Sequence, residues 1–202
     1  MHPPRALYCE FPLGRPLGKP GDPAFQRRVL EAAFALFNRP SGPVLEDFPE
    51  TIEDESASPL ACAIPPRHDP TLPPAVDEAI ALRGAYERQR GRSGRSIVGH
   101  EVDADGIPDA VAAMLRIAEG IPIEDAGLPG SPRDVGLDIR AYYEEAALAL
   151  ADHVPAARQT DAWFFRSTEA GSVLKRAIAA LRSAGVDESL WMRVIPRPYE
   201  DG

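Results

Sequence analysis

Proline is the residue type that most constrains how this chain can fold. The 202-residue chain contains 22 prolines, about twice the usual share, and they gather between residues 3 and 74. Because proline fixes φ and has no backbone N–H to donate, it interrupts both helices and sheets. We therefore expect this part of the chain to be rich in turns and extended crossings, with few long helices.

Residues 1–52 carry the signals of a short β-loop-α-β segment of the α/β class. Residues 5–11 (RALYCEF) form an apolar, aromatic run between prolines, which is typical of a buried strand. Residues 12–22 (PLGRPLGKPGD), which we call the Pro/Gly loop, alternate proline with glycine and predict a shaped, non-repetitive turn. An aspartate cap and a proline then begin a helix predicted over residues 23–37, and VLEDFPETI is predicted to form a second strand.

The rest of the chain is predicted to be mostly helical. Residues 53–74 are loop-like and Pro-rich, and we expect them to form a linker. Residues 75–202 are expected to form a helical lobe, to which residues 96–102 could add a strand. The chain is therefore expected to be predominantly helical, and its parts could still form one compact domain. Apolar periodicity and stop signals predict helices over residues 74–89, 108–119, 137–151 and 168–183.

Charge and composition exclude several classes of partner. The chain has 31 acidic and 22 basic residues and a net charge of -9, so it has no positive field for a phosphate backbone and nucleic acid is not an expected partner. The apolar runs are shorter than the roughly 20 residues that cross a bilayer, so no membrane association is expected and we predict a cytoplasmic protein. Cys9 and Cys62 are expected to be free thiols, although a disulfide between them would also be compatible with the sequence.

The opening segment contains a dense set of positions that resembles a known family. It begins with PPR before the first predicted strand, continues through the Pro/Gly loop, and starts its helix near GDP-x-x-Q. This pattern resembles the C-terminal segment of the glycine/sarcosine/betaine/D-proline reductase B-protein (selenoprotein B) family. The matching positions are Pro3, Pro4, Arg5, Phe11, Pro12, Leu13, Gly14, Gly18, Gly21, Asp22, Pro23 and Gln26.

The resemblance implies a role beside a reductase rather than a self-contained catalyst. Members of the family break a carbon–heteroatom bond with a selenocysteine or cysteine on a Rossmann-like portion that the present 202 residues do not include. Cys9 does not fall on that redox motif, so the resemblance assigns no catalytic residue and no cofactor. It implies an accessory or small subunit of an oxidoreductase, docked on a separately encoded reductase-like protein and completing its small-molecule site.

Strand pairing gives an independent reason to expect a protein partner. A strand of seven residues needs neighbours on its hydrogen-bonding edges, and the sequence predicts only one or two other strands. An open strand edge is a natural place for another chain to add. The alternative is that the predicted strands form a small sheet of their own, covered by the helices.

The Pro/Gly loop is the first candidate ligand site. Gly14, Arg15, Gly18 and Lys19 precede the predicted start of a helix, and such a glycine-rich, basic turn can hold a carboxylate or phosphate. A small anionic molecule is therefore the expected ligand. The alternative interpretation is a rigid connection that only orients the helix.

The helical lobe provides a rival hypothesis, that of an independent small-molecule enzyme or binding protein. Its pocket would lie between the Pro/Gly loop and the helical lobe, lined by Arg15, His100, Tyr142 and Glu145. Asp138, Tyr142 and Glu145 follow one another at offsets of four and three on one predicted helix, where acid–base work or a structural role would both fit.

Two further clusters of side chains are candidates for function. His100 and Glu101 beside Asp103 and Asp105 could bind a metal ion, but alternation along a strand and helix capping favour no metal site. The aromatic run in DAWFF is expected to be core, with a pocket wall or a partner surface as the alternative.

Overall fold

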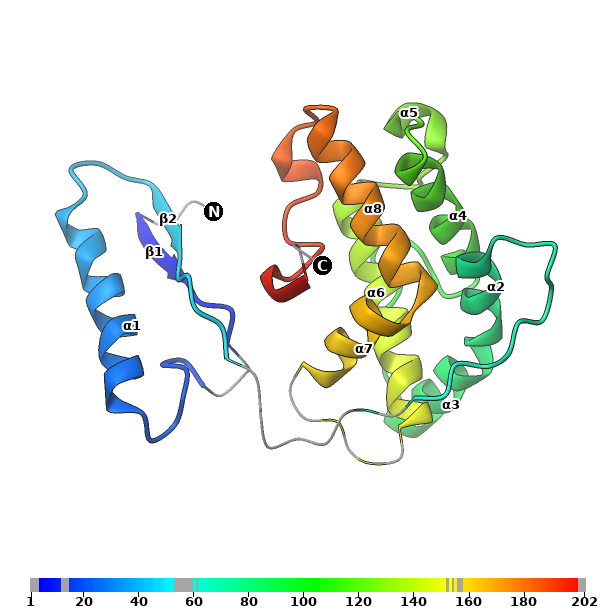
Figure 1. Ribbon diagram of the computed structural model, residues 1–202, viewed down its shortest axis with the longest axis horizontal. Helices are drawn as coiled ribbons and strands as arrows, with labels where there is room; N and C mark the ends of the chain where they lie inside the picture. The colour runs from blue at the N-terminus through cyan, green and yellow to red at the C-terminus, as the bar shows by residue number, and fades with distance from the viewer. Residues whose placement is uncertain are drawn as a thin grey trace. The chain divides into compact units, whose positions relative to one another are not determined.

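A computed structural model describes residues 4–11, 15–52, 60, 62–151, 153, 155 and 158–199, and helices dominate it as predicted (Figure 1). The chain divides into two compact units. Unit 1 comprises Met1–Ala57 with Ala156–Arg158, and unit 2 comprises Ser58–Pro155 with Gln159–Gly202. None of the helices among the described residues combines the length and apolar character that a membrane crossing requires.

Unit 1 is built on the predicted β-loop-α-β sequence of elements. Strand β1 spans Arg5–Tyr8, helix α1 spans Pro23–Ala35 with a 3-10 turn at Leu36–Asn38, and strand β2 spans Val44–Asp47. The two strands are parallel, with a register that runs from Arg5 opposite Val44 to Tyr8 opposite Asp47. Both strands are shorter than predicted. Helix α1 begins as expected, because Asp22 accepts a hydrogen bond from the backbone N–H of Phe25 at 2.9 Å.

A small aromatic core joins α1 to the strands of unit 1. Phe25 and Val29 of α1 are buried against Phe48 and Ile52, which follow β2. The rings of Phe11, Phe25 and Phe48 lie 5.7 to 5.9 Å apart between centroids in tilted and edge-on contacts. These contacts are the main apolar burial in the unit, so α1 covers one face of a sheet of two strands.

Unit 2 is a helical lobe in which α3 packs on α6, and α4 packs between α2 and α8. Figure 1 shows α4, α6 and α8 running through it as its long elements. Its elements are α2 Pro74–Ala81, α3 Arg83–Ser93, α4 Ile107–Ala118, α5 Ile123–Ala126, α6 Pro132–Leu150, α7 Gln159–Ser167, α8 Glu169–Ser183, and 3-10 turns at Glu188–Leu190 and Arg197–Tyr199.

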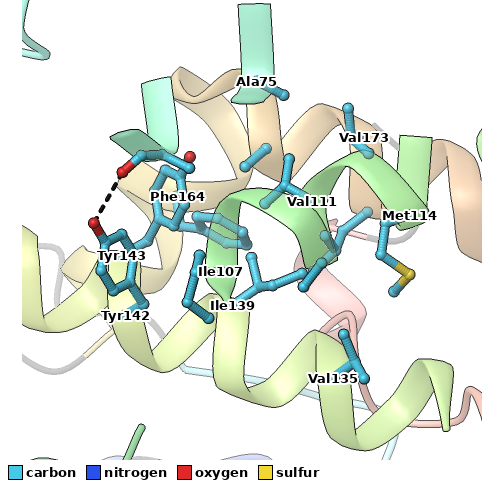
Figure 2. Close-up of a cluster of buried hydrophobic side chains, with 14 of the residues drawn as sticks. Ala75, Ile107, Val111, Met114, Val135, Ile139, Tyr142, Tyr143, Phe164 and Val173 are labelled. Atoms are coloured by element: carbon cyan, nitrogen blue, oxygen red, sulfur yellow. Dashed lines mark hydrogen bonds between the residues drawn. The ribbon is translucent and has the colours of Figure 1, made fainter. Parts of the chain in front are cut away.

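The core of unit 2 is a continuous apolar cluster between these helices (Figure 2). Ile107 and Val111 of α4 meet Ile139 of α6 and Phe164 of α7, all fully buried. The aromatic run of DAWFF lies in α7 and is buried, which confirms its assignment to the core. That run forms a helix of its own, which the sequence interpretation did not include.

Three predicted elements differ from the structure. The helix expected over residues 74–89 is two helices that meet at the buried Leu82, and the second continues to Ser93, where Gly94 ends it with φ +67°. Residues 96–102 are not a strand, because their backbone N–H groups bond to carboxylates of α6. Helix α6 begins at Pro132 rather than at residue 137.

The expected linker packs largely on unit 2. Leu60, Cys62 and Ile64 lie against the core of the helical lobe. The backbone N–H groups of His68 and Asp69 both donate to the buried carboxylate of Asp77, each at 2.9 Å. Residues 53–59 and 61 lie outside the described residues. The described part of this segment therefore belongs to the lobe.

Gly171 of α8 lies very close to the backbone of α7, and its replacement tests how tightly the junction between α7 and α8 is packed. A Cβ atom there would overlap the carbonyl oxygen of Phe164. We expect Gly171→Ala to lower the free energy of unfolding by about 2 kcal/mol or more, because backbone must move to make room.

The matched control is Gly91→Ala, on α3, where an added Cβ would meet open space. That substitution should raise stability by about 0.5–1 kcal/mol, since alanine is the better helix former. Urea unfolding of the two variants measures both effects. Equal stabilisation by both would show that the α7–α8 junction is not tightly packed.

Candidate functional site

A pocket of about 610 Å³ lies on α6 of unit 2, and we call it the α6 pocket. This volume is in the range of small-molecule sites. Four of the α6 residues that line it, at positions 133, 137, 140 and 144, are spaced four, three and four positions apart, so they share one face of the helix. The residues on which its chemistry depends are Arg133, Leu137, Arg140 and Glu144 of α6, with Ile97 and His100 from the segment before α4.

The wall that carries His100 is held by one carboxylate. Asp138, only 2% exposed, accepts hydrogen bonds from the backbone N–H groups of Gly99, His100, Glu101 and Val102 at 2.7 to 3.2 Å. Burial by itself would raise the pKa of Asp138, but the hydrogen bonds from the backbone outweigh it and hold the pKa below its ordinary value. The carboxylate is therefore charged and fully engaged.

Glu145 and Tyr142 also hold the fold rather than line the α6 pocket. Glu145 Oε1 accepts the backbone N–H of Ile97 at 2.9 Å and the Ser96 hydroxyl lies 3.1 Å from the same oxygen. The buried Tyr142 hydroxyl donates to the carbonyl oxygen of Ala79 at 2.8 Å, and burial raises its pKa. These two side chains tie α6 to the segment before α4 and to α2.

At the other end of the pocket, Arg140 lies between two carboxyl groups. Its Nη2 atom is 2.9 Å from Asp161 Oδ1 and 3.4 Å from Glu144 Oε1, and its Nη1 donates to the carbonyl oxygen of Val194 at 3.0 Å. Burial, and then the neighbouring Asp161, raise the pKa of Glu144 to about 8, although Arg140 acts in the opposite direction. Near neutral pH, the pair Glu144–Asp161 therefore carries a proton.

Residues 15–22, the described part of the Pro/Gly loop, form a compact turn tied to the start of α1. Gly18 has φ +82°, its N–H donates to the carbonyl oxygen of Arg15 at 2.9 Å, and a Cβ there would overlap the Phe25 ring. The carbonyl oxygen of the exposed Lys19 accepts a hydrogen bond from Gln26 Nε2 at 3.0 Å. Gly14 lies outside the described residues. Residues 15–22 are thus shaped by their packing on α1.

The predicted ligand residues fall into separate groups. Arg15, Gly18 and Lys19 belong to unit 1, and neither of the pockets described in the structure is lined by them. In addition, the chain's own Asp22 takes one of the N–H donors at the start of α1, where an anion was expected. Of the predicted residues in unit 2, His100 alone lines the α6 pocket among the described residues.

Several pocket residues were missed by the sequence interpretation, although a signal for them exists. Ser131 caps α6 by accepting the backbone N–H of Asp134 at 3.1 Å, and Pro132 occupies the first turn. Reading this Ser-Pro start would have extended the predicted helix, which began at residue 137, to include Arg133 and Asp134 of the pocket. The partner of Glu144, Asp161 on α7, is distant in the sequence and gave no local signal.

The described residues contain no group of three or more histidine, cysteine, aspartate or glutamate side chains placed to hold a metal ion. Cys9 and Cys62 are free thiols, and burial raises the pKa of Cys9. His100 Nδ1 lies 3.7 Å from Glu101 Oε1. The polar side chains that line the α6 pocket carry guanidinium, carboxyl and imidazole groups.

Removing the charge of Asp138 tests its role in fixing the pocket wall. Asp138→Asn keeps the shape but replaces one acceptor oxygen by an NH₂ group that faces two N–H donors. We expect the free energy of unfolding to fall by about 2–4 kcal/mol. Asp109→Asn, on the exposed first turn of α4, should change it by no more than about 0.5 kcal/mol. Equal effects of the two in urea unfolding would contradict this role.

The pH dependence of stability tests the Glu144–Asp161 pair. A raised pKa means that between pH about 4.5 and about 8 the folded protein keeps a proton that the unfolded chain releases, so stability falls as pH rises through this window. Glu144→Gln stays neutral and should lose this dependence. Relative to wild type, its free energy of unfolding should grow by on the order of 1–3 kcal/mol from pH 5 to pH 8.

The control for that measurement is Glu119→Gln, which replaces an exposed carboxylate at the end of α4. Its unfolding free energy should run parallel to that of wild type across the same pH range. A constant difference between Glu144→Gln and wild type would show that the pair holds no extra proton.

Comparisons with known proteins found no match to this chain among protein-family models, among curated proteins or among solved structures. We therefore infer a function from the geometry of the two units and from the residues of the opening segment.

Proposed function

We propose that the chain is a cytoplasmic accessory subunit of a reductase-like enzyme, related to glycine and betaine reductases, and that unit 1 docks on a separately encoded subunit. The observation that carries this proposal is the incomplete sheet of unit 1. It consists of two parallel strands among the described residues, with a helix on one face.

Parallel sheets are ordinarily larger and are covered on both faces. Along each strand of a parallel pair, the backbone N–H groups point alternately toward the other strand and away from it. In unit 1 the N–H groups of Leu7 and Leu45 point away from the edge that the two strands share. No third strand pairs there among the described residues. A strand of another protein could extend this sheet at either edge, as in β-strand addition.

The face of the sheet opposite α1 supports the same proposal. Leu7 packs toward Phe25 and Val29, so its neighbours Ala6 and Tyr8 lie on the opposite face, and Leu45 is paired with Ala6. Leu45 is 51% exposed. A parallel strand pair with an exposed leucine on its second face resembles a piece cut from a larger α/β sheet.

Helix α1 and the 3-10 turn that follows it also present a second apolar stripe away from the core. Leu30, Phe34 and Phe37 follow helical spacing, and the two phenylalanines are 61% and 73% exposed and stacked with ring centroids 6.3 Å apart. Large apolar side chains grouped in this way are typical of interaction surfaces. We infer that the stripe packs on the partner when the sheet of unit 1 is extended.

The resemblance of residues 3–37 supplies the class of partner. The matching positions include Arg5 of β1, Gly18 of the Pro/Gly loop, and Asp22, Pro23 and Gln26 at the start of α1. In relatives of this family the same pattern follows a Rossmann-like portion in one chain. We propose that the present chain supplies this segment in trans, with its Pro/Gly loop placed at the edge of the partner's site for a small anionic substrate.

A second candidate is a protein that binds a small molecule by itself. The α6 pocket favours it, because its volume of about 610 Å³ and its mixture of guanidinium, carboxyl and apolar side chains suit a small ligand. The two candidates are compatible, since the pocket belongs to unit 2 and the proposed docking surface belongs to unit 1.

Gentle purification of the tagged chain from its native cells tests the subunit proposal. Native mass spectrometry should find a heteromer, and peptide sequencing of the second chain should identify a protein with a Rossmann-like portion and a catalytic cysteine or selenocysteine. Leu45→Glu should weaken this complex at least tenfold, because it places a charge on the apolar sheet face.

The matched control is Leu148→Glu, which changes a leucine of unit 2 that is also partly exposed. It should leave the heteromer intact. A chain that stays alone, a partner of another class, or a complex that tolerates Leu45→Glu as well as Leu148→Glu would contradict the proposal.

A further inference from the structure

The charged side chains that line the α6 pocket differ in whether they have a partner within the protein. Asp138 is engaged by four backbone N–H groups. Asp134 accepts the Ser131 hydroxyl at 2.7 Å. Arg140 is paired with Asp161 at 2.9 Å. Arg133 is exposed at the pocket, and its guanidinium has no ion pair or hydrogen bond with any described residue. Arg133 is therefore the guanidinium of this lining that has no partner among the described residues, while the Asp134 carboxylate beside it keeps its negative charge.

The pocket is also lined by exposed apolar side chains, whose contact with water is unfavourable. Ile97 is 76% exposed and Leu137 is among the exposed apolar residues of unit 2, and both line this pocket beside Ala141. An apolar ligand body placed between Ile97 and Leu137 would remove this surface from water, which favours binding. The pocket thus joins one free guanidinium to an apolar wall.

The wall is formed before any ligand arrives. Asp138 fixes the backbone of residues 99–102, and Glu145 fixes the N–H of Ile97 at 2.9 Å. Because these bonds order the segment in the free protein, a ligand does not have to order it on binding. This arrangement distinguishes the pocket from a crevice between mobile side chains.

We propose that the α6 pocket binds a small monocarboxylate with an apolar body, held by the Arg133 guanidinium and covered by Ile97 and Leu137. A guanidinium pairs with a carboxylate through two parallel hydrogen bonds, which fixes the orientation of the ligand. A doubly charged phosphate fits less well, because the Asp134 carboxylate lines the same pocket. This inference uses no residue of unit 1 and is independent of the subunit proposal.

The test uses the full chain and 3-phenylpropanoate as the probe, followed by two-dimensional NMR of the backbone amides. The probe should shift amide signals of residues 97–102 and 133–144, while the neutral 3-phenylpropanamide should bind at least about tenfold more weakly. Arg133→Gln should weaken binding of the carboxylate by a similar factor. Ile97→Ser should weaken it several-fold, because it removes apolar contact.

Arg176→Gln is the matched control, since it removes an exposed guanidinium from α8, and it should bind the probe as wild type does. All variants change exposed side chains, and their amide spectra show directly that they are folded. The proposal would be overturned by no binding up to about 10 mM, by equal binding of the amide, by shifts outside the pocket, or by equal effects of Arg133→Gln and Arg176→Gln.

Discussion

The requirement that backbone N–H groups find acceptors shapes both units of this chain. In unit 2, buried carboxylates supply these acceptors where the chain is irregular. Asp138 accepts four N–H groups of the segment before α4, Asp77 accepts two of the segment before α2, and Glu78 accepts those of Glu169 and Ala170 at the start of α8. In unit 1 the outward edges of two strands lack a third strand among the described residues.

Elements that are fixed by neighbouring residues could be predicted from the sequence. The aspartate and proline that start α1 lie within one turn of the groups they serve, so the sequence shows them directly. The failed strand prediction has a long-range cause. Residues 96–102 look like a strand because they are short and apolar, but their hydrogen-bond partners, Asp138 and Glu145, are more than 35 positions away. The same limit applied to the site, where Asp161 approaches Glu144 only through the packing of α7 on α6.

The two units point to different kinds of interaction. Unit 1 combines an incomplete parallel sheet with an apolar stripe of Leu30, Phe34 and Phe37, features that a protein partner would cover. Unit 2 has a continuous core, carboxylates that accept backbone N–H groups and a pocket with a fixed wall, features that suit a small molecule. Two residues predicted to line one pocket, Arg15 and Glu145, thus belong to different units.

Native-state hydrogen exchange on the purified chain tests the central claim, that unit 1 is an incomplete α/β piece, most directly. The N–H groups of Leu7 and Leu45 should exchange rapidly, because they point away from the shared strand edge. Those of residues 99–102 should be protected despite their irregular backbone, because Asp138 holds them. Strong protection of Leu7 and Leu45, equal to that of the α4 and α6 core, would contradict the account, since the sheet of unit 1 would then already be complete.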